Sequence, residues 1–212
     1  MSRDLFDVFE ELGDHFNHRP TGLALHYPFI FSAVVGLETK EAFEFGSGRS
    51  TSVIFDALGH TGGHLTIVSP KEEPLLGLVR SLTHHRGLSQ DFRHVDVPPL
   101  EFVLHDGSHD AATVAEDLAW IIPRVRPFGL IFVHDPHHSY SGPGVQDGIY
   151  AGLRRHGQIT WSATTLPYGF GLTVIRIEHN KLLTPLVLEK PAKSRSEHRT
   201  VPTPFLARSR DR

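Results

Sequence analysis

The stretch Glu44-Phe-Gly-Ser-Gly-Arg-Ser-Thr51 decides the fold, because it places a glycine-rich turn between an expected strand and an expected helix. The segment 41–45 is typical of a short buried strand. The segment 51–58 is typical of a helix, and the hydroxyl of Ser50 is expected to cap it. A strand, a glycine turn and a helix in this order favour a nucleotide-like ligand at the turn.

Two glycines in the turn, Gly46 and Gly48, let the backbone bend sharply and approach a ligand closely, which a Cβ would obstruct. The free N–H groups at the start of the helix face whatever occupies the turn. Alternatively, the glycines serve only the geometry of the connection. A nicotinamide dehydrogenase is disfavoured, because Thr51 stands where the third glycine of that fingerprint belongs.

The rest of the chain alternates between expected strands and helices. Further strands are expected at 64–68, 91–97, 101–104 and 130–133, and helices at 27–37, 72–86 and 111–122. This alternation predicts parallel strands with helices on both faces of the sheet. Two final strands, 159–166 and 170–177, are separated only by Pro167-Tyr-Gly169, so they are expected to lie antiparallel or to flank one another.

The composition describes a soluble globular protein of one domain. The chain has 212 residues, 39% of them hydrophobic, with a formal charge of -3 and no cysteine. Disulfides, thiolate metal sites and cysteine nucleophiles are therefore excluded. The chain lacks the basic excess that would indicate a nucleic-acid partner. It also lacks a long apolar run or a leader pattern, which would indicate a membrane or secretion, so we expect a cytoplasmic protein.

Both ends of the chain differ from its middle. Residues 1–39 are expected to form a helical segment that packs on the core, beginning with an amphipathic helix at 4–16 whose apolar face is compatible with a homodimer. Residues 40–180 form the expected α/β domain. The basic, proline-containing tail 181–212 is expected to be solvated and flexible.

Histidines and aspartates follow two of the predicted strands. His105-Asp-Gly-Ser-His109 and His134-Asp-Pro-His-His138 both come directly after an apolar run. Ligands of open α/β sheets lie outside the carboxyl ends of the strands, so these two segments are expected to meet at one edge. The alternative is that histidines follow these strands by chance, because the chain contains 16 of them.

This edge could hold a divalent cation between Asp106 and Asp135. Carboxylates suit Mg²⁺, Ca²⁺ or Mn²⁺, whereas an imidazole from His134 or His137 would favour Mn²⁺, Fe²⁺ or Zn²⁺. Alternatively, both aspartates order their loops. His109 is a candidate general base, since imidazole titrates near neutral pH, or else a histidine that bonds the start of a helix. Asp110 is expected to be the N-cap of that helix.

These motifs resemble those of class I S-adenosylmethionine (SAM)-dependent methyltransferases. The turn at 44–51 resembles their first motif, and the pair 102–109 and 126–135 is similar to the branch of metal-dependent sugar O-methyltransferases and cephalosporin hydroxylase-like proteins. The resemblance covers about residues 40–177. It implies a doubly wound, Rossmann-like α/β fold whose seven-stranded sheet is mostly parallel and ends in an antiparallel hairpin.

The resemblance also implies roles for individual residues. The residues expected to bind the cofactor SAM are Glu44, Gly46, Ser47, Gly48, Ser69 and Asp106. The expected metal ligands are Asp106, Asp135 and His134, for Mg²⁺ first and for Mn²⁺ or Fe²⁺ as alternatives. The expected catalytic residues are His109 and Asp106.

Two departures concern the cofactor. The second strand of such enzymes normally ends in an acid that binds the ribose, and Ser69 stands there instead, with Glu72 or Glu73 as substitutes in the next segment. The connection Val97-Pro-Pro-Leu100 is expected to be too short for a helix and an adenine-binding loop.

The expected function is methyl transfer from SAM to an oxygen of a small-molecule acceptor, assisted by a divalent metal. One rival is a metal-dependent enzyme of another reaction type on the same scaffold. The other is a non-catalytic binding subunit, which the serine at position 69 would suit.

Overall fold

The computed structural model describes residues 22–71, 81–137 and 143–183. Its helical elements are η1 (Gly22–His26), α2 (Tyr27–Gly36), α3 (Arg49–Thr61), α4 (Ser89–Phe92), α5 (Ala111–Ile121), η3 (Ile122–Arg124) and α6 (Val145–Leu153). Its strands are β1 (Glu41–Phe45), β2 (His64–Ser69), β3 (Leu82–Arg86), β4 (Leu100–His105), β5 (Val125–His134), β6 (Ile159–Leu166) and β7 (Leu172–Asn180).

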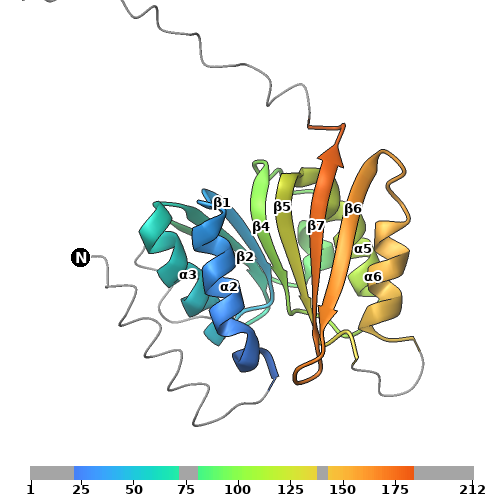
Figure 1. The fold of residues 1–212 in the computed structure, drawn as a ribbon, viewed down its shortest axis with the longest axis horizontal. Coiled ribbons are helices and arrows are strands. Elements are labelled where there is room, and N and C mark those ends of the chain that lie inside the picture. The colour runs from blue at the N-terminus through green and yellow to red at the C-terminus, as the bar shows by residue number, and fades with distance from the viewer. Residues whose placement is uncertain (1–21, 72–80, 138–142, 184–212) are drawn as a thin grey trace, which may run out of the picture.

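The strands form one seven-stranded sheet in the order β3-β2-β1-β4-β5-β7-β6 (Figure 1). Strands β1 to β5 run parallel to one another, while β7 runs antiparallel to both β5 and β6. The strand order reverses beside β1, where the chain passes from the β2–β3 side to β4. The predicted fold class, with its parallel sheet and antiparallel hairpin, is confirmed.

Helices cover both faces of the sheet (Figure 1). Phe43 and Phe45 of β1 point to the face on which α5 and α6 pack, and Ala42 points to the face covered by α2 and α3. Two apolar cores result, one on each side, and both are fully buried at their centres. This arrangement is what a strand alternating between two apolar faces requires.

The third strand expected from the sequence, at 91–97, is wrong. Residues 91–97 form the end of the short helix α4 and a turn, and the strand paired with β2 is β3 at Leu82–Arg86. It lies at the sheet edge and is only half-buried, so it lacks the apolar run that marks an inner strand. The connection from β3 to β4 consequently spans 87–99 and includes a helix, so the expected shortness before Leu100 is wrong too.

Other expectations for the ends of elements meet mixed outcomes. Asp110 caps α5 as predicted, since its carboxylate accepts a 2.8 Å hydrogen bond from the N–H of Thr113. Of the helix expected at 72–86, residues 72–80 lie outside the described residues, and the expectation is wrong for 82–86, which form the strand β3. The helix expected at 4–16 and residues 184–212 of the expected tail also lie outside the described residues. Within the described ranges, no helix has both the length and the apolar character that crossing a bilayer requires.

Candidate functional site

The turn after β1 brings the backbone of Gly46 against that of Asp106, the residue that follows β4. Gly46 has φ +92°, and a Cβ there would lie 2.5 Å from the carbonyl oxygen of Asp106. No other residue type fits this contact without displacing backbone. The predicted need for glycine is therefore met at Gly46, whereas Gly48 has extended backbone and open space around its Cβ position.

The start of α3 is organised by a buried carboxylate rather than by Ser50. Gly48 is the N-cap, so the predicted Ser50 cap is wrong. The hydroxyls of Ser50 and Thr51 instead donate to the two oxygens of Glu44, at 2.6 and 2.7 Å. Glu44 is fully buried beneath the turn, so it holds the first turn of the helix in place.

A pocket of about 330 Å³ opens at the carboxyl ends of β1, β2 and β4. Its lining includes Gly46, Ser47, Ser69, Leu88, Gln90 and Asp106. Four of the six residues expected to bind the cofactor thus line one pocket, while Glu44 and Gly48 do not. This volume is in the usual range for a small-molecule site.

Ser69 closes one wall of this pocket where an acid was expected. Its hydroxyl oxygen accepts hydrogen bonds from the hydroxyl of Ser47, at 2.8 Å, and from the N–H of Lys71, at 3.2 Å. With both bonds accepted, the proton of Ser69 is oriented to donate elsewhere. The wall is neutral at this point, so it offers a ligand weaker hydrogen bonds than a carboxylate would.

Beside this pocket, the residues after β4 and β5 form a cluster of carboxylates and imidazoles. The Nδ1 of His134 lies 3.0 Å from Oδ1 of Asp106, and its Nε2 lies 3.1 Å from Oδ1 of Asp135. One ligand atom from each of these three residues lies within 4.8 Å of the others. The three side chains expected to hold a metal are therefore brought together, whereas His137, the other histidine considered, lies outside this group.

Asp135 adopts an unusual backbone conformation, with φ +58°. Left-handed backbone is strained for most residues, although aspartate and asparagine tolerate it better than others. The conformation turns the chain directly after β5. The second oxygen of Asp135 lies 2.9 Å from Nε2 of His109, whose side chain is 42% exposed. His109 is thus held at the cluster by a carboxylate.

The sequence reasoning missed His26, which lies at the end of η1. Its side chain is fully buried, and its ring packs edge-on against that of His134 with centroids 6.2 Å apart. Its Nε2 lies 3.0 Å from the carbonyl oxygen of Tyr168. Burial lowers the pKa of His26, so the neutral ring is favoured. His26 lies far from His134 in the sequence and belongs to no motif, so no sequence signal could have identified it.

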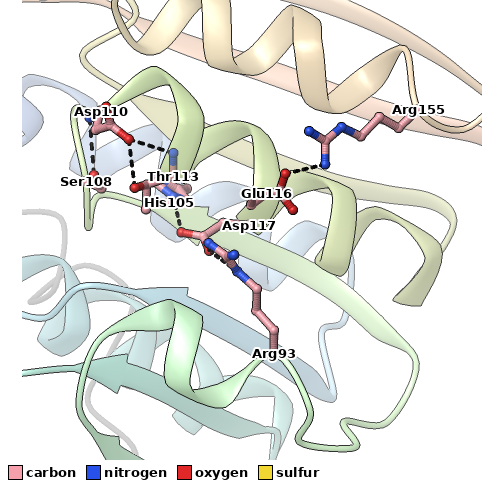
Figure 2. Close-up of polar contacts among 8 residues, drawn as sticks. All are labelled: Arg93, His105, Ser108, Asp110, Thr113, Glu116, Asp117 and Arg155. Atoms are coloured by element: carbon pink, nitrogen blue, oxygen red, sulfur yellow. Dashed lines mark hydrogen bonds and ion pairs between the residues drawn. The ribbon is translucent and has the colours of Figure 1, made fainter.

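A second missed feature is an ion network under the pocket (Figure 2). Asp117 of α5 is buried and accepts two hydrogen bonds from Arg93 through Oδ1, at 2.9 and 2.8 Å. Its Oδ2 lies 3.2 Å from Nε2 of His105, the last residue of β4. The network fixes the end of β4 against α5 and so supports the adjacent Asp106. The apolar periodicity of α5 did not indicate that the carboxylate of Asp117 faces inward.

Residues 43–136 match a family model described as a methyltransferase domain. This stretch of the chain is similar to a methyltransferase domain. The match begins in β1 and ends just after Asp135, so it includes the glycine turn and the whole Asp106–His134–Asp135 group. The expected resemblance to class I methyltransferases is confirmed. No curated protein matches the sequence closely enough to be counted as a relative.

Solved structures with this fold include several methyltransferases. The O-methyltransferase from Bacillus cereus, in complex with SAH, is 15% identical with a TM-score of 0.55, and the match covers 83% of this chain and 92% of that one. The O-methyltransferase TomG from Streptomyces achromogenes, involved in tomaymycin synthesis and in complex with SAM, is 15% identical with a TM-score of 0.57, covering 84% and 91%.

A third similar structure is the MycE methyltransferase of the mycinamycin biosynthetic pathway, in complex with Mg, SAH and mycinamycin VI. It is 17% identical with a TM-score of 0.58, and the match covers 81% of this chain but 54% of that one. At such identities these likenesses establish the methyltransferase fold.

Proposed function

We propose that this protein transfers a methyl group from SAM to an oxygen of a small-molecule acceptor, with the help of a divalent metal. The observation that carries the proposal is the position of Asp106. This residue lines the pocket at the glycine turn and also contacts His134 in the carboxylate–imidazole cluster. A methyl donor in the pocket and an acceptor at the cluster would therefore be neighbours.

The pocket has the features that a SAM site needs at its turn. Gly46 allows close approach of a ligand to the backbone, and Ser47 and Ser69 provide hydroxyls on the facing wall. The matching family model and the SAM- and SAH-bound neighbours support the same ligand. Ser69 in place of an acid predicts weaker binding of ribose hydroxyls rather than a different cofactor.

The cluster has the donor set of a divalent-metal site. His134 and Asp135 would ligate the ion through Nε2 and Oδ1, which are buried without a hydrogen bond in the described structure, and Asp106 would orient His134 through its Nδ1. A bound divalent metal would supply positive charge that lowers the pKa of an acceptor hydroxyl.

In this proposal His109 would take the acceptor's proton. Its contact with Asp135 orients the ring, and its partial exposure leaves a path for the proton to solvent. In the proposed reaction the O–H bond of the acceptor breaks and its proton passes to His109. The acceptor oxygen forms a bond to the methyl carbon while the carbon–sulfur bond of SAM breaks, so SAH leaves neutral at sulfur.

The cluster's imidazoles also favour a second candidate, a metal-dependent enzyme of another reaction type on this scaffold. Calorimetric titration of SAM into metal-stripped protein, repeated with Mg²⁺, Mn²⁺ and Fe²⁺, separates the two. We expect SAM to bind, and Asp106→Asn to weaken binding while Asp110→Asn, at the exposed cap of α5, does not. The absence of SAM binding with any metal would overturn the methyl-transfer proposal. It would favour a metal-dependent enzyme of another reaction type or a non-catalytic binding subunit.

A further inference from the structure

Unpaired buried polar atoms gather at one place in the described part of the chain. The buried side-chain atoms without a hydrogen-bond partner there are His26 Nδ1, Thr39 Oγ1, Trp120 Nε1, His134 Nε2 and Asp135 Oδ1. Three of these five belong to His26, His134 and Asp135, which neighbour one another. Burying such atoms unpaired costs free energy, so three together indicate a missing partner that all of them face or surround.

The hydrogen bonds of the two histidines assign their protons. A carbonyl oxygen only accepts, so Nε2 of His26 donates to Tyr168 and its Nδ1 carries a lone pair. An ionised carboxylate also only accepts, so Nδ1 of His134 donates to Asp106 and its Nε2 carries the lone pair in the neutral ring. The missing partner must therefore be an electron-pair acceptor.

The contact between His134 and Asp135 gives the same answer. Nε2 of His134 and Oδ1 of Asp135 lie 3.1 Å apart, as close as an ion pair, yet no hydrogen bond joins them. A lone pair and a carboxylate oxygen at this distance repel each other unless a proton or a metal cation lies between them, and the geometry of a hydrogen bond is absent here. Two ligand atoms, each about 2.1 Å from one ion at a right angle, are about 3.0 Å apart.

Second contacts hold each of these two ligands in place. Asp106 fixes the tautomer of His134, which is the carboxylate–histidine arrangement common behind metal ligands. His109 bonds the other oxygen of Asp135, so Oδ1 is the oxygen turned to the site. His26 lies outside the compact group of Asp106, His134 and Asp135, so its lone pair faces the outer sphere of an ion held there.

We propose that this centre is selective for a divalent transition metal of the Mn²⁺, Fe²⁺ or Co²⁺ class over Mg²⁺, and that Nε2 of His134 is the ligand that discriminates. The proposal deepens the metal-assisted function above and rests on the same cluster. Mg²⁺ prefers oxygen ligands and keeps its waters, whereas imidazole suits the first-row transition metals. An all-carboxylate cluster would not make this distinction.

The test is an electron-spin-resonance measurement, which requires no enzymatic turnover. Metal-stripped protein is loaded with Mn²⁺, and electron spin-echo modulation detects coupling to the imidazole nitrogen, with ¹⁵N-histidine labelling to identify the source. We expect nitrogen coupling in the native chain, and loss of it in His134→Asp, which keeps an oxygen ligand at that position. His137→Asn, a histidine of the described loop outside the cluster, is the matched control and should retain the coupling.

Competition between ions gives the second measurement. Mg²⁺ should displace bound Mn²⁺ only at a large excess in the native chain, and His134→Asp should lower the Mn²⁺-to-Mg²⁺ affinity ratio at least tenfold. His26→Gln should keep the coupling, because its ring is outside the first sphere. Bound Mn²⁺ without nitrogen coupling in the native chain would overturn the proposal even if His134→Asp did not fold. The SAM titration is independent, so failure of either proposal is recognisable.

Discussion

The carboxylate of Asp106 lies 3.0 Å from Nδ1 of His134, across the gap between the ends of β4 and β5. Because the two strands are neighbours in register, this contact follows directly from the parallel pairing of β4 with β5. Asp106 also lines the pocket at the glycine turn. The Asp106 side chain thus belongs both to the pocket and to the carboxylate–imidazole cluster, and its replacement should affect ligand binding at both.

Asp106→Asn should lower the affinity for a divalent metal about 10- to 100-fold, because it replaces the charged acceptor that orients His134 with a neutral amide. Isothermal titration with Mn²⁺ measures the change. Asp110→Asn is the control, since this aspartate caps α5 through Thr113 and lies outside the Asp106–His134–Asp135 group. Equal metal affinity in Asp106→Asn and the native chain would contradict the role given to this contact.

Asp135 allows its metal role to be separated from its backbone role. Asp135→Asn removes the charge but tolerates the φ of +58°, so it should lose metal binding with little change in unfolding free energy. Asp135→Ala should lose metal binding and also about 1–2 kcal/mol of stability, because alanine is strained there. Urea denaturation of both variants without metal gives the comparison; equal stabilities would argue against strain at this position.

The two glycines of the turn should respond differently to a methyl group. Gly46→Ala should cost at least about 2 kcal/mol, because its Cβ would lie 2.5 Å from the Asp106 carbonyl and its φ is +92°. Gly48→Ala should change stability by no more than about 0.5 kcal/mol, since nothing lies within 4 Å of its Cβ position. Thermal unfolding of the pair, followed by circular dichroism, measures this, and similar melting temperatures would refute it.

Asp117 and Glu116 are adjacent on α5 and contact different partners (Figure 2), and Asp117 is buried whereas Glu116 is exposed. Asp117→Ala leaves Arg93 and the buried His105 without their carboxylate and should destabilise the fold by about 3–5 kcal/mol. Glu116→Ala removes a pair with Arg155 whose side chains are 47% and 46% exposed, and should cost less than about 1 kcal/mol. Denaturant titrations of both variants test the contrast, which similar losses would contradict.

His26 should make the metal-free protein less stable in mild acid. Burial lowers the pKa of His26 below its ordinary 6.5, so the unfolded chain binds this proton more readily than the folded chain. The stability associated with the neutral ring is present above pH 6.5 and falls as the pH drops from there through the lowered pKa. His26→Gln should flatten that part of the profile; an unchanged slope of unfolding free energy against pH would disprove this.

The sequence predicted those parts of the fold that rest on local patterns. β1, the glycine turn and β2 were found because apolar runs and glycines mark them, and the clustering of Asp106, His134 and Asp135 followed from the rule that parallel strands end at one edge. These inferences need only the chain order and the hydrophobic period.

The sequence failed where tertiary contacts decide. β3 lies at the sheet edge with half-buried polar residues, so only its pairing with β2 makes it a strand. Ser50 looked like a cap, but the buried carboxylate of Glu44 takes its hydroxyl. His26 and Asp117 reach their sites from other elements, and no local spacing could indicate which partners they meet.

The position of β7 between β5 and β6 has a consequence for how the chain acquires its shape during synthesis. The outer edge of β5 and the inner edge of β6 both remain unpaired until residues 172–180 are synthesised, the last strand of the described part of the chain. Until then, two open edges lie within one nascent polypeptide and invite pairing with other chains. A translational pause placed just before residue 172 should therefore be more hazardous for this protein than one placed after residue 180.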